Sequence, residues 1–228
     1  RPATDSDHVV LVSSGGYACR FLPSEVKTRV DPNSGETQTT HTVRVQGRVS
    51  QGVSGMKLGQ TDSVIGMIVT DDFETSVLTI SKFGMAKRSR LGSGNMIPAL
   101  DENGADILDE SGEVIIVRDG YRKTNRGTKG VRTMGLSEND SIVSVRQIPD
   151  LEDQLFMLAK SGMMIRMPAT QTKETLGKVT KGTRIMELRD SEKKSHVDEI
   201  IFVARLPADL IDSEDDSDDE TEATSEEE

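Results

Sequence analysis

Three copies of one twelve-residue phrase constrain the fold of this chain more than any other feature of its sequence. They span residues 47–58, 125–136 and 177–188, and each has a base at its second position, Gly at its sixth, Met at its tenth and Leu at its twelfth. Such self-similarity is typical of blades, propellers and solenoids, in which each unit buries its apolar face only against its neighbours. The phrase therefore predicts three repeated units instead of one continuous core.

Two further patterns flank each copy of the phrase. Upstream of each copy lie an apolar run, a Gly turn and a second strand. This strand ends in an Arg four residues after the Gly, at Arg20, Arg88 and Arg166. Downstream, an Asp opens a short apolar strand, at Asp62, Asp140 and Asp198. This order of strands and turns predicts an all-β chain, and the three Asp residues are expected to close turns by hydrogen bonding.

The units differ in what they insert between the turn and the phrase. We expect blade one at residues 1–74 with an insert at 28–43, blade two at 75–150 with an insert at 92–120, and a compact blade three at 151–208. The first insert is polar and is predicted to be a solvent-exposed loop. The second contains the apolar run at 113–117, which could pair as an extra strand.

Composition excludes several classes of function. Aromatic residues make up 3% of the chain, so the core must be built from Val, Ile, Leu and Met. No apolar run approaches the length needed to cross a bilayer, and no signal peptide is visible. His8, His41 and His196 lie in unrelated contexts and Cys19 is the single cysteine, so we expect no catalytic residues, no metal and no cofactor in this chain. Because the chain opens on Arg1 without an initiator Met, we also expect a fragment of a longer protein.

Charge is distributed unevenly along the chain. The net charge is −11, but residues 209–228 carry twelve acidic residues and no base, which predicts a disordered acidic tail. The remaining 28 bases and 27 acids nearly cancel, and the bases concentrate in the repeated phrases. The candidate DNA-binding residues are Arg48, Lys57, Arg122, Lys123, Arg126, Lys129, Arg132, Lys178, Lys181 and Arg184.

Basic loops at the same point of successive blades would form a curved positive stripe that suits a bent polyanion. Glycines such as Gly52, Gly127, Gly130 and Gly182 would let backbone N–H groups approach phosphates. The scarcity of aromatic residues favours duplex-backbone contacts over base stacking. Two alternatives remain open. The glycines and bases are only turn formers and solvated side chains, or the faces of the blades bind proteins as an interaction scaffold.

These phrases resemble the C-terminal domain of the A subunits of DNA gyrase and topoisomerase IV. The resemblance rests on residues 53–58 (VSGMKL), 62–67 (DSVIGM), 84–89 (GMAKRS) and 125–131 (NRGTKGV), and on the acidic end. It covers residues 7–228 and implies a β-pinwheel, a disc of four-stranded antiparallel blades that exchange strands, of which about three blades are present. The family's intact basic signature box is missing, and residues 123–130 form the nearest degenerate copy.

The resemblance also implies a function and a setting. The chain would be a non-catalytic DNA-wrapping part of the gyrase A subunit, in an ATP-dependent type IIA topoisomerase that supercoils DNA negatively. Its partners would be duplex DNA, the rest of the A subunit and the B subunit, and it would bind no membrane. Its location would be the bacterial cytoplasm, at the nucleoid. ATP and Mg²⁺ would be used through other domains. The alternative within the family is topoisomerase IV, which decatenates DNA and selects DNA segments.

Overall fold

The chain is all-β in a computed structural model that describes residues 3–101, 103–175, 180–188 and 198–210. All paired strands are antiparallel. The helical elements of the described part are two single 3₁₀ turns, η1 (Ala169–Gln171) and η2 (Ala208–Leu210). None of the described helices is long and apolar enough to span a membrane.

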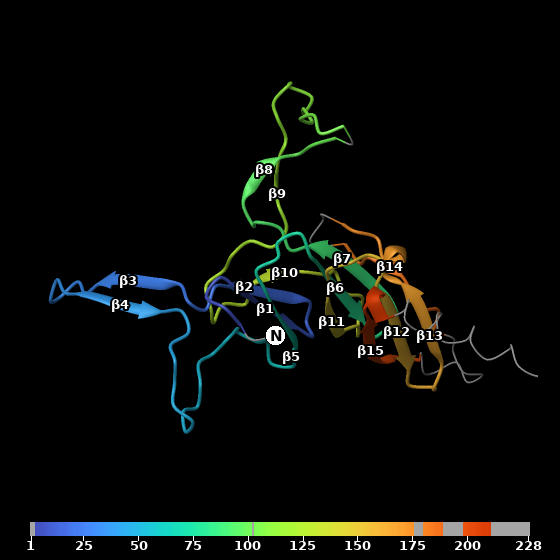
Figure 1. The fold of residues 1–228 in the computed structure, drawn as a ribbon, viewed down its shortest axis with the longest axis horizontal. Helices are drawn as coiled ribbons and strands as arrows, with labels where there is room; N and C mark the ends of the chain where they lie inside the picture. Colours follow the sequence, from blue (N-terminus) through green and yellow to red (C-terminus); the bar gives the residue numbers. More distant parts are fainter. Residues whose placement is uncertain (1–2, 102, 176–179, 189–197, 211–228) are drawn as a thin grey trace, which may run out of the picture.

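Three sheets form the body of the molecule (Figure 1). The first contains β1 (His8–Ser13), β2 (Tyr17–Phe21), β5 (Val64–Thr70) and β10 (Val131–Arg132), in the order β10-β2-β1-β5. The second contains β6 (Ser76–Ser81), β7 (Met85–Arg90), β11 (Ile142–Ile148) and β14 (Thr183–Arg184), in the order β11-β6-β7-β14. The third contains β12 (Gln154–Ala159), β13 (Met164–Pro168) and β15 (Ile200–Leu206), in the order β13-β12-β15. The strands predicted around the Gly turns and after the Asp residues are therefore confirmed.

The second and third copies of the repeated phrase each supply a strand to the sheet of the preceding unit, whereas the first copy forms no strand. In the second copy of the phrase, Val131 pairs with Ala18 of the first sheet, and in the third copy Thr183 pairs with Ala86 of the second sheet. A Cβ on Gly130 would lie 2.1 Å from the carbonyl oxygen of Ala18, and a Cβ on Gly182 would lie the same distance from that of Ala86. These glycines are therefore required for close backbone approach between units.

Strand exchange also explains why one expectation is wrong. The resemblance predicts four strands in each blade, but the third sheet has three among the described residues. The fourth strand of a sheet comes from the phrase of the next unit, and the sequence has no fourth copy of the phrase. Within the described part, the outer edge of β13 consequently lacks the strand that β2 and β7 receive.

The Met of the phrase joins the apolar cores of neighbouring units. Met134 is fully buried in a cluster with Val10 and Val12 of the first sheet and Val77 of the second. Met186 is buried in a cluster that combines residues of the second and third sheets, including Leu78 and Leu155. The phrase thus contributes both a strand and a core residue to the contact between units.

The two inserts leave the body as separate projections (Figure 1). The prediction that residues 28–43 are largely solvent-exposed is confirmed, but half of them are strand and not loop. β3 (Val26–Val30) and β4 (Thr37–His41) pair as a hairpin in which every strand residue is exposed. Alternating Val, Thr, Lys and Arg suit an extended ribbon even without a core to cover it. The extra strand predicted at 113–117 is confirmed in part, because β9 (Ile116–Arg118) pairs with β8 (Met96–Pro98) of the same insert.

The three Asp residues of the downstream pattern close turns, as predicted. Asp62 Oδ1 accepts hydrogen bonds from Ser14 Oγ and Gly15 N, both at 2.7 Å. Asp140 Oδ1 accepts from Phe83 N at 3.3 Å, and Asp198 Oδ1 accepts from Ser161 N at 3.1 Å. A second hydrogen bond, from the Ser161 hydroxyl, lowers the pKa of Asp198.

Candidate nucleic-acid interface

The exchanged strands place basic side chains at the outer edges of two successive sheets. Lys129 and Arg132 accompany β10, which is the edge strand of the first sheet, and Lys181 and Arg184 accompany β14, the edge strand of the second. All four residues are exposed. The same Lys-x-x-Arg pair therefore recurs at equivalent positions of neighbouring blades because the phrase itself forms the edge.

At the first of these edges the cations surround Tyr17. The Lys129 ammonium nitrogen lies 4.1 Å from the centre of the Tyr17 ring, and Arg132 Nη2 donates to the Tyr17 hydroxyl at 3.0 Å. Hydrogen bonding from Lys129, with the charge of Arg132, lowers the pKa of the Tyr17 phenol. The ring is occupied by the side chains of the protein, so the edge presents positive charge in place of a stacking platform.

An open hollow of about 470 Å³ lies beside this edge and is lined by Arg122, Lys123 and Lys129. Lys123 Nζ is 2.6 Å from Glu25 Oε1, a hydrogen bond that lowers the pKa of Glu25. Lys27 of the β3–β4 hairpin donates to Asn125 Oδ1 at 2.6 Å, which ties the hairpin to the second copy of the phrase. Sequence reasoning missed Lys27, because the contact joins residues 98 positions apart.

Arg126 has a different role from the one expected of an exposed rim base. It is partly buried, its Nε donates to the carbonyl of Thr42 at 2.7 Å, and its Nη1 donates to the carbonyl of Ser54 at 2.5 Å. The guanidinium thus joins the second copy of the phrase to two segments of the first unit. Arg126, a candidate DNA-binding residue, is therefore engaged in contacts between units.

The remaining candidates are not gathered into one cluster. Arg48 and Lys57 are exposed in the first copy of the phrase, and the backbone N–H of Lys57 donates to the carbonyl of Thr128 at 2.9 Å. Lys178 lies outside the described residues. The structure therefore brings together Arg122, Lys123, Lys129 and Arg132, and repeats the last two as Lys181 and Arg184 on the next blade.

In the first and second units the Arg four residues after the Gly turn links its unit to the next, a role that sequence reasoning missed. The third, Arg166, is exposed and donates to Gln154 of its own sheet. Arg20 is 1% exposed and its Nη1 donates to the carbonyls of Gly92 and Tyr121, both at 2.8 Å. Burial lowers the pKa of this guanidinium to about 10. Arg88 is equivalent, because its Nε donates to the carbonyl of Thr172 of the third unit at 3.2 Å. The recurrence of this Arg four residues after the Gly turn was the feature of the sequence that could have indicated such a role.

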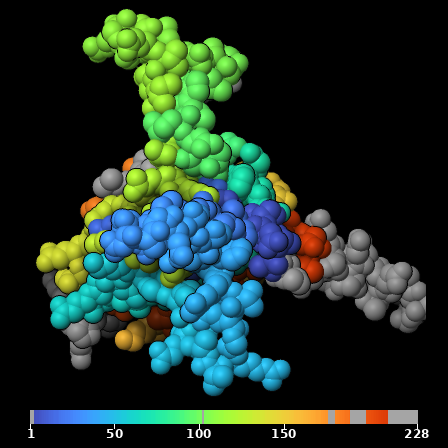
Figure 2. Space-filling view, turned by 90° about the vertical axis from the view of Figure 1, so that its left-hand side faces the viewer, coloured from blue at the N-terminus to red at the C-terminus, as the bar shows by residue number. Residues whose placement is uncertain are grey.

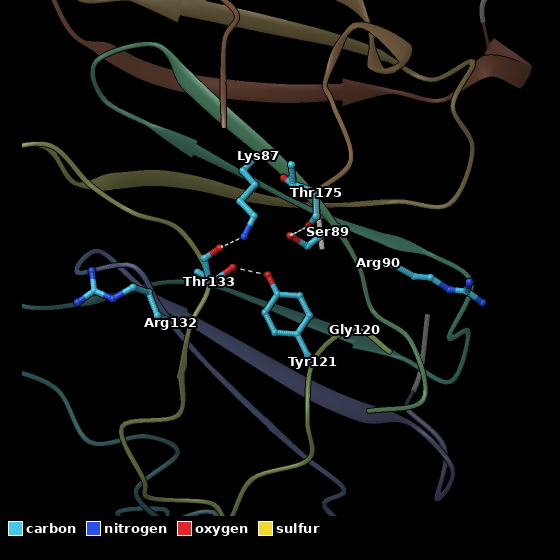
Figure 3. A pocket seen from close by; sticks show the side chains of 8 residues that line it. All are labelled: Lys87, Ser89, Arg90, Gly120, Tyr121, Arg132, Thr133 and Thr175. Carbon is cyan, nitrogen blue, oxygen red and sulfur yellow. Dashed lines mark hydrogen bonds between the residues drawn. The ribbon is translucent and has the colours of Figure 1, made fainter. Parts of the chain in front are cut away.

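Figure 3 shows a small pocket at the seam between the first two sheets. Lys87, on β7 and 2% exposed, donates from Nζ to the carbonyl of Thr133 at 2.6 Å, and the Tyr121 hydroxyl bonds the Thr133 hydroxyl. Burial raises the pKa of Tyr121. In the same view Arg90 and Arg132 point away from Thr133. These contacts fix the exchanged strand between two sheets and leave Tyr121 too buried for a base to stack on it.

Within the described part of the chain, no group of three or more His, Cys, Asp or Glu residues could hold a metal ion. Cys19 is buried, and its Sγ lies 3.2 Å from Thr124 Oγ1. What the arrangement offers chemically is a set of fixed positive charges at two sheet edges, a pattern suited to phosphate contacts.

Comparison with known proteins agrees with this geometry. The family described as DNA gyrase C-terminal domain, beta-propeller, matches residues 7–29, 39–71, 118–149 and 153–197, which is more than half of the chain. The chain therefore belongs to the β-pinwheel C-terminal domain family of the gyrase and topoisomerase IV A subunits, and the resemblance seen in the sequence is confirmed.

Individual relatives are distant in sequence. The DNA gyrase A subunit of Rickettsia bellii is 25% identical over 250 residues, covering 99% of this chain and 25% of that protein. The gyrase A subunit of Haloquadratum walsbyi is 28% identical over 191 residues, covering 83% and 17%. The chain thus spans a quarter or less of the length of these relatives. Among solved structures, the E. coli ParC C-terminal domain aligns with a TM-score of 0.46 and 16% identity, over 88% of this chain and 80% of that one.

Proposed function

We propose that this chain is a non-catalytic DNA-binding and DNA-wrapping portion of the DNA gyrase A subunit. The observation that carries the proposal is strand exchange, which places the Lys129/Arg132 pair and the Lys181/Arg184 pair at the outer edges of two successive sheets. A duplex that followed these edges would meet positive charge at the same point of each blade. In the disc of blades that the family implies, a duplex that followed successive edges would bend.

The mechanism is electrostatic. Lysine and arginine side chains at the edges neutralise phosphates and release their counterions, which supplies most of the binding free energy and carries no sequence information. The guanidinium contacts of Arg20 and Arg88 hold neighbouring units together, so the bases keep their spacing when the duplex is bent. ATP and Mg²⁺ would act through other domains of the full enzyme. Gyrase is preferred to topoisomerase IV because the relatives described above are gyrase A subunits.

A salt titration with a linear duplex tests the binding step. The logarithm of the association constant should fall with the logarithm of salt concentration, with a slope near −0.9 for each phosphate contacted. The double variant Lys129→Ala/Arg132→Ala should flatten that slope by about two units. The matched control is Lys160→Ala, an exposed lysine at the turn between β12 and β13. A slope that is the same in all three proteins would refute the assigned contacts.

A linking-number assay tests wrapping. A closed circular plasmid is relaxed by a type I topoisomerase in the presence of the chain, and a wrapped duplex should leave a shifted distribution of topoisomers. Salt-dependent binding without such a shift would reduce the proposal to DNA binding. The absence of both would favour the interaction-scaffold alternative.

A further inference from the structure

The insert between β7 and β10 carries an eight-residue repeat of its own. Residues 97–104, 105–112 and 113–120 each end in Gly, with a positive φ of 80°, 81° and 66° in turn. The third and fourth positions of the repeat are apolar throughout, as Ala99-Leu100, Ile107-Leu108 and Ile115-Ile116. We call residues 95–118 the arm and residues 99–115 its head.

The head is a hydrogen-bonded junction of three chain segments. Ile107 N donates to the Ala99 carbonyl, Ile115 N to the Ile107 carbonyl, and Ala99 N to the Ile115 carbonyl, each at 2.8 Å. Asp101 and Asp109 close equivalent turns, with Oδ1 of each accepting two backbone N–H bonds at 2.8–3.0 Å. The head therefore has a defined shape.

The stalk of the arm is fixed to the body. Arg118 Nη1 donates to the carbonyl of Gly94 at 2.6 Å, and Asp119 Oδ2 accepts from Ser93 N at 2.7 Å. Asp119 also lies 3.8 Å from Arg90 of β7. Figure 2 shows the result, a narrow stalk with a broader head that stands clear of the body.

The arm exposes an unusual number of apolar side chains. Leu100, Leu108 and Ile116, which share one position of the repeat, are 56%, 54% and 51% exposed. Five more large apolar residues of the arm are exposed, namely Met96, Ile97, Ile107, Val114 and Ile115. None of these residues belongs to a core cluster of the described chain. Concentrated apolar exposure of this kind marks a surface that a partner covers.

The charge of the arm selects the kind of partner. Between residues 95 and 117 the sequence has six acidic residues and no base: Asp101, Glu102, Asp106, Asp109, Glu110 and Glu113. Phosphates would be repelled, so the arm does not extend the basic edges. Two acidic heads would also repel each other, which disfavours a second copy of the arm as the occupant. The family match leaves residues 72–117 unmatched, a range that contains most of the arm together with β6 and β7.

We propose that the arm is a docking element for a second protein whose contact surface is apolar and edged by lysine and arginine side chains. The apolar positions of the octapeptide supply the centre of the contact, and the carboxylates around them supply orientation and discrimination. This contact is separate from the basic edges, so it does not depend on DNA binding.

Two synthetic peptides of equal length test the proposal with the full chain. One alternates Leu with Lys, and the other alternates Leu with Glu. Binding is measured by fluorescence anisotropy to the wild type, to Leu100→Ser/Leu108→Ser/Ile116→Ser, and to the matched control Val26→Ser/Val30→Ser, which alters exposed apolar residues of the other hairpin. The Lys peptide should bind the wild type and the control alike, and the arm variant at least tenfold more weakly. Because the acidic tail is present in the wild type and in every variant, it contributes equally to peptide binding by all of them.

A charge variant keeps the test decisive if the serine variant disturbs the arm. Asp106→Asn/Glu110→Gln/Glu113→Gln spares Asp101 and Asp109, whose carboxylates close the turns. It should weaken the Lys peptide severalfold and reduce the salt dependence of binding. Equal affinity of the Lys peptide for the wild type and both arm variants would overturn the proposal. So would a Glu peptide that binds the wild type as tightly as the Lys peptide does. Dimerisation of the wild type that the serine variant abolishes would replace the basic partner with a second copy of this chain.

Discussion

Replacing Gly130 with alanine tests whether the exchanged strand assembles the basic edge. The new Cβ would lie 2.1 Å from the carbonyl oxygen and 2.6 Å from the carbonyl carbon of Ala18, whereas a carbon–oxygen contact needs about 3.3 Å. Both atoms are backbone, so the strand itself must move by about 1 Å. The left-handed backbone of this residue adds a cost of roughly 1–2 kcal/mol for any side chain.

The displacement should also break backbone hydrogen bonds of the exchanged segment. Val131 and Arg132 pair with β2, and Thr133 N donates to the Gly16 carbonyl at 2.9 Å. Two or three lost hydrogen bonds cost about 1 kcal/mol each. Added to the cost of the left-handed backbone, they should lower the free energy of unfolding by roughly 3–5 kcal/mol. Lys129 and Arg132 would leave the edge with the strand, so the affinity for duplex DNA should fall as well.

Gly52→Ala is the matched control for this experiment. Gly52 occupies the same position of the first copy and has a φ of 77°, but a Cβ there would meet no atom within 4 Å. Its cost should therefore be the backbone term alone, about 1–2 kcal/mol. Urea unfolding followed by circular dichroism measures both losses. If Gly130→Ala is no more destabilising than Gly52→Ala, the reasoning from strand exchange is refuted.

Three further predictions concern pH, the open edge and the tail. The pKa of His8 is lowered to about 4, first by burial and then by Arg20, so the unfolded chain takes up this proton near pH 6.5 before the folded chain does. The thermal unfolding midpoint should consequently be steady above pH 6.5 and fall between about pH 6.5 and 4. The variant His8→Gln should lessen that fall, whereas the control His41→Gln, at an exposed site, should not. Since β13 lacks an outer partner among the described residues, residues 1–210 should self-associate in sedimentation, and a compact monomer at all concentrations would contradict this. Residues 212–228, which lie outside the described part of the chain, carry eleven of the twelve carboxylates of the tail. If these carboxylates compete for the edge bases, removing the segment should tighten duplex binding at low salt, whereas equal affinities would leave the tail without that role.

Most strands were predictable because their signals are local. Apolar runs separated by Gly turns specify β1 with β2, β6 with β7, and β12 with β13, and the Asp before β5, β11 and β15 signals a turn. The β3–β4 hairpin was missed because its strand residues are all exposed and only Val26 and Val30 among them are apolar, so no apolar face marks the strands. Among the candidate DNA-binding residues, Lys129 and Arg132 are exposed at a sheet edge, but Arg126 is partly buried because its hydrogen-bond acceptors are carbonyls of the first unit.

The sequence by itself determined that the chain is built from repeated β units, that each unit has a Gly turn, an Asp turn and a basic phrase, and that the bases recur in register. Only the tertiary structure decided where each phrase goes. Gly130 and Gly182 approach the carbonyls of Ala18 and Ala86 in the preceding sheet, so the phrase completes its neighbour's blade and carries its bases to that edge. Local periodicity specifies that a segment is a strand, but the choice of partner depends on backbone contacts between residues more than ninety positions apart, which no local pattern encodes.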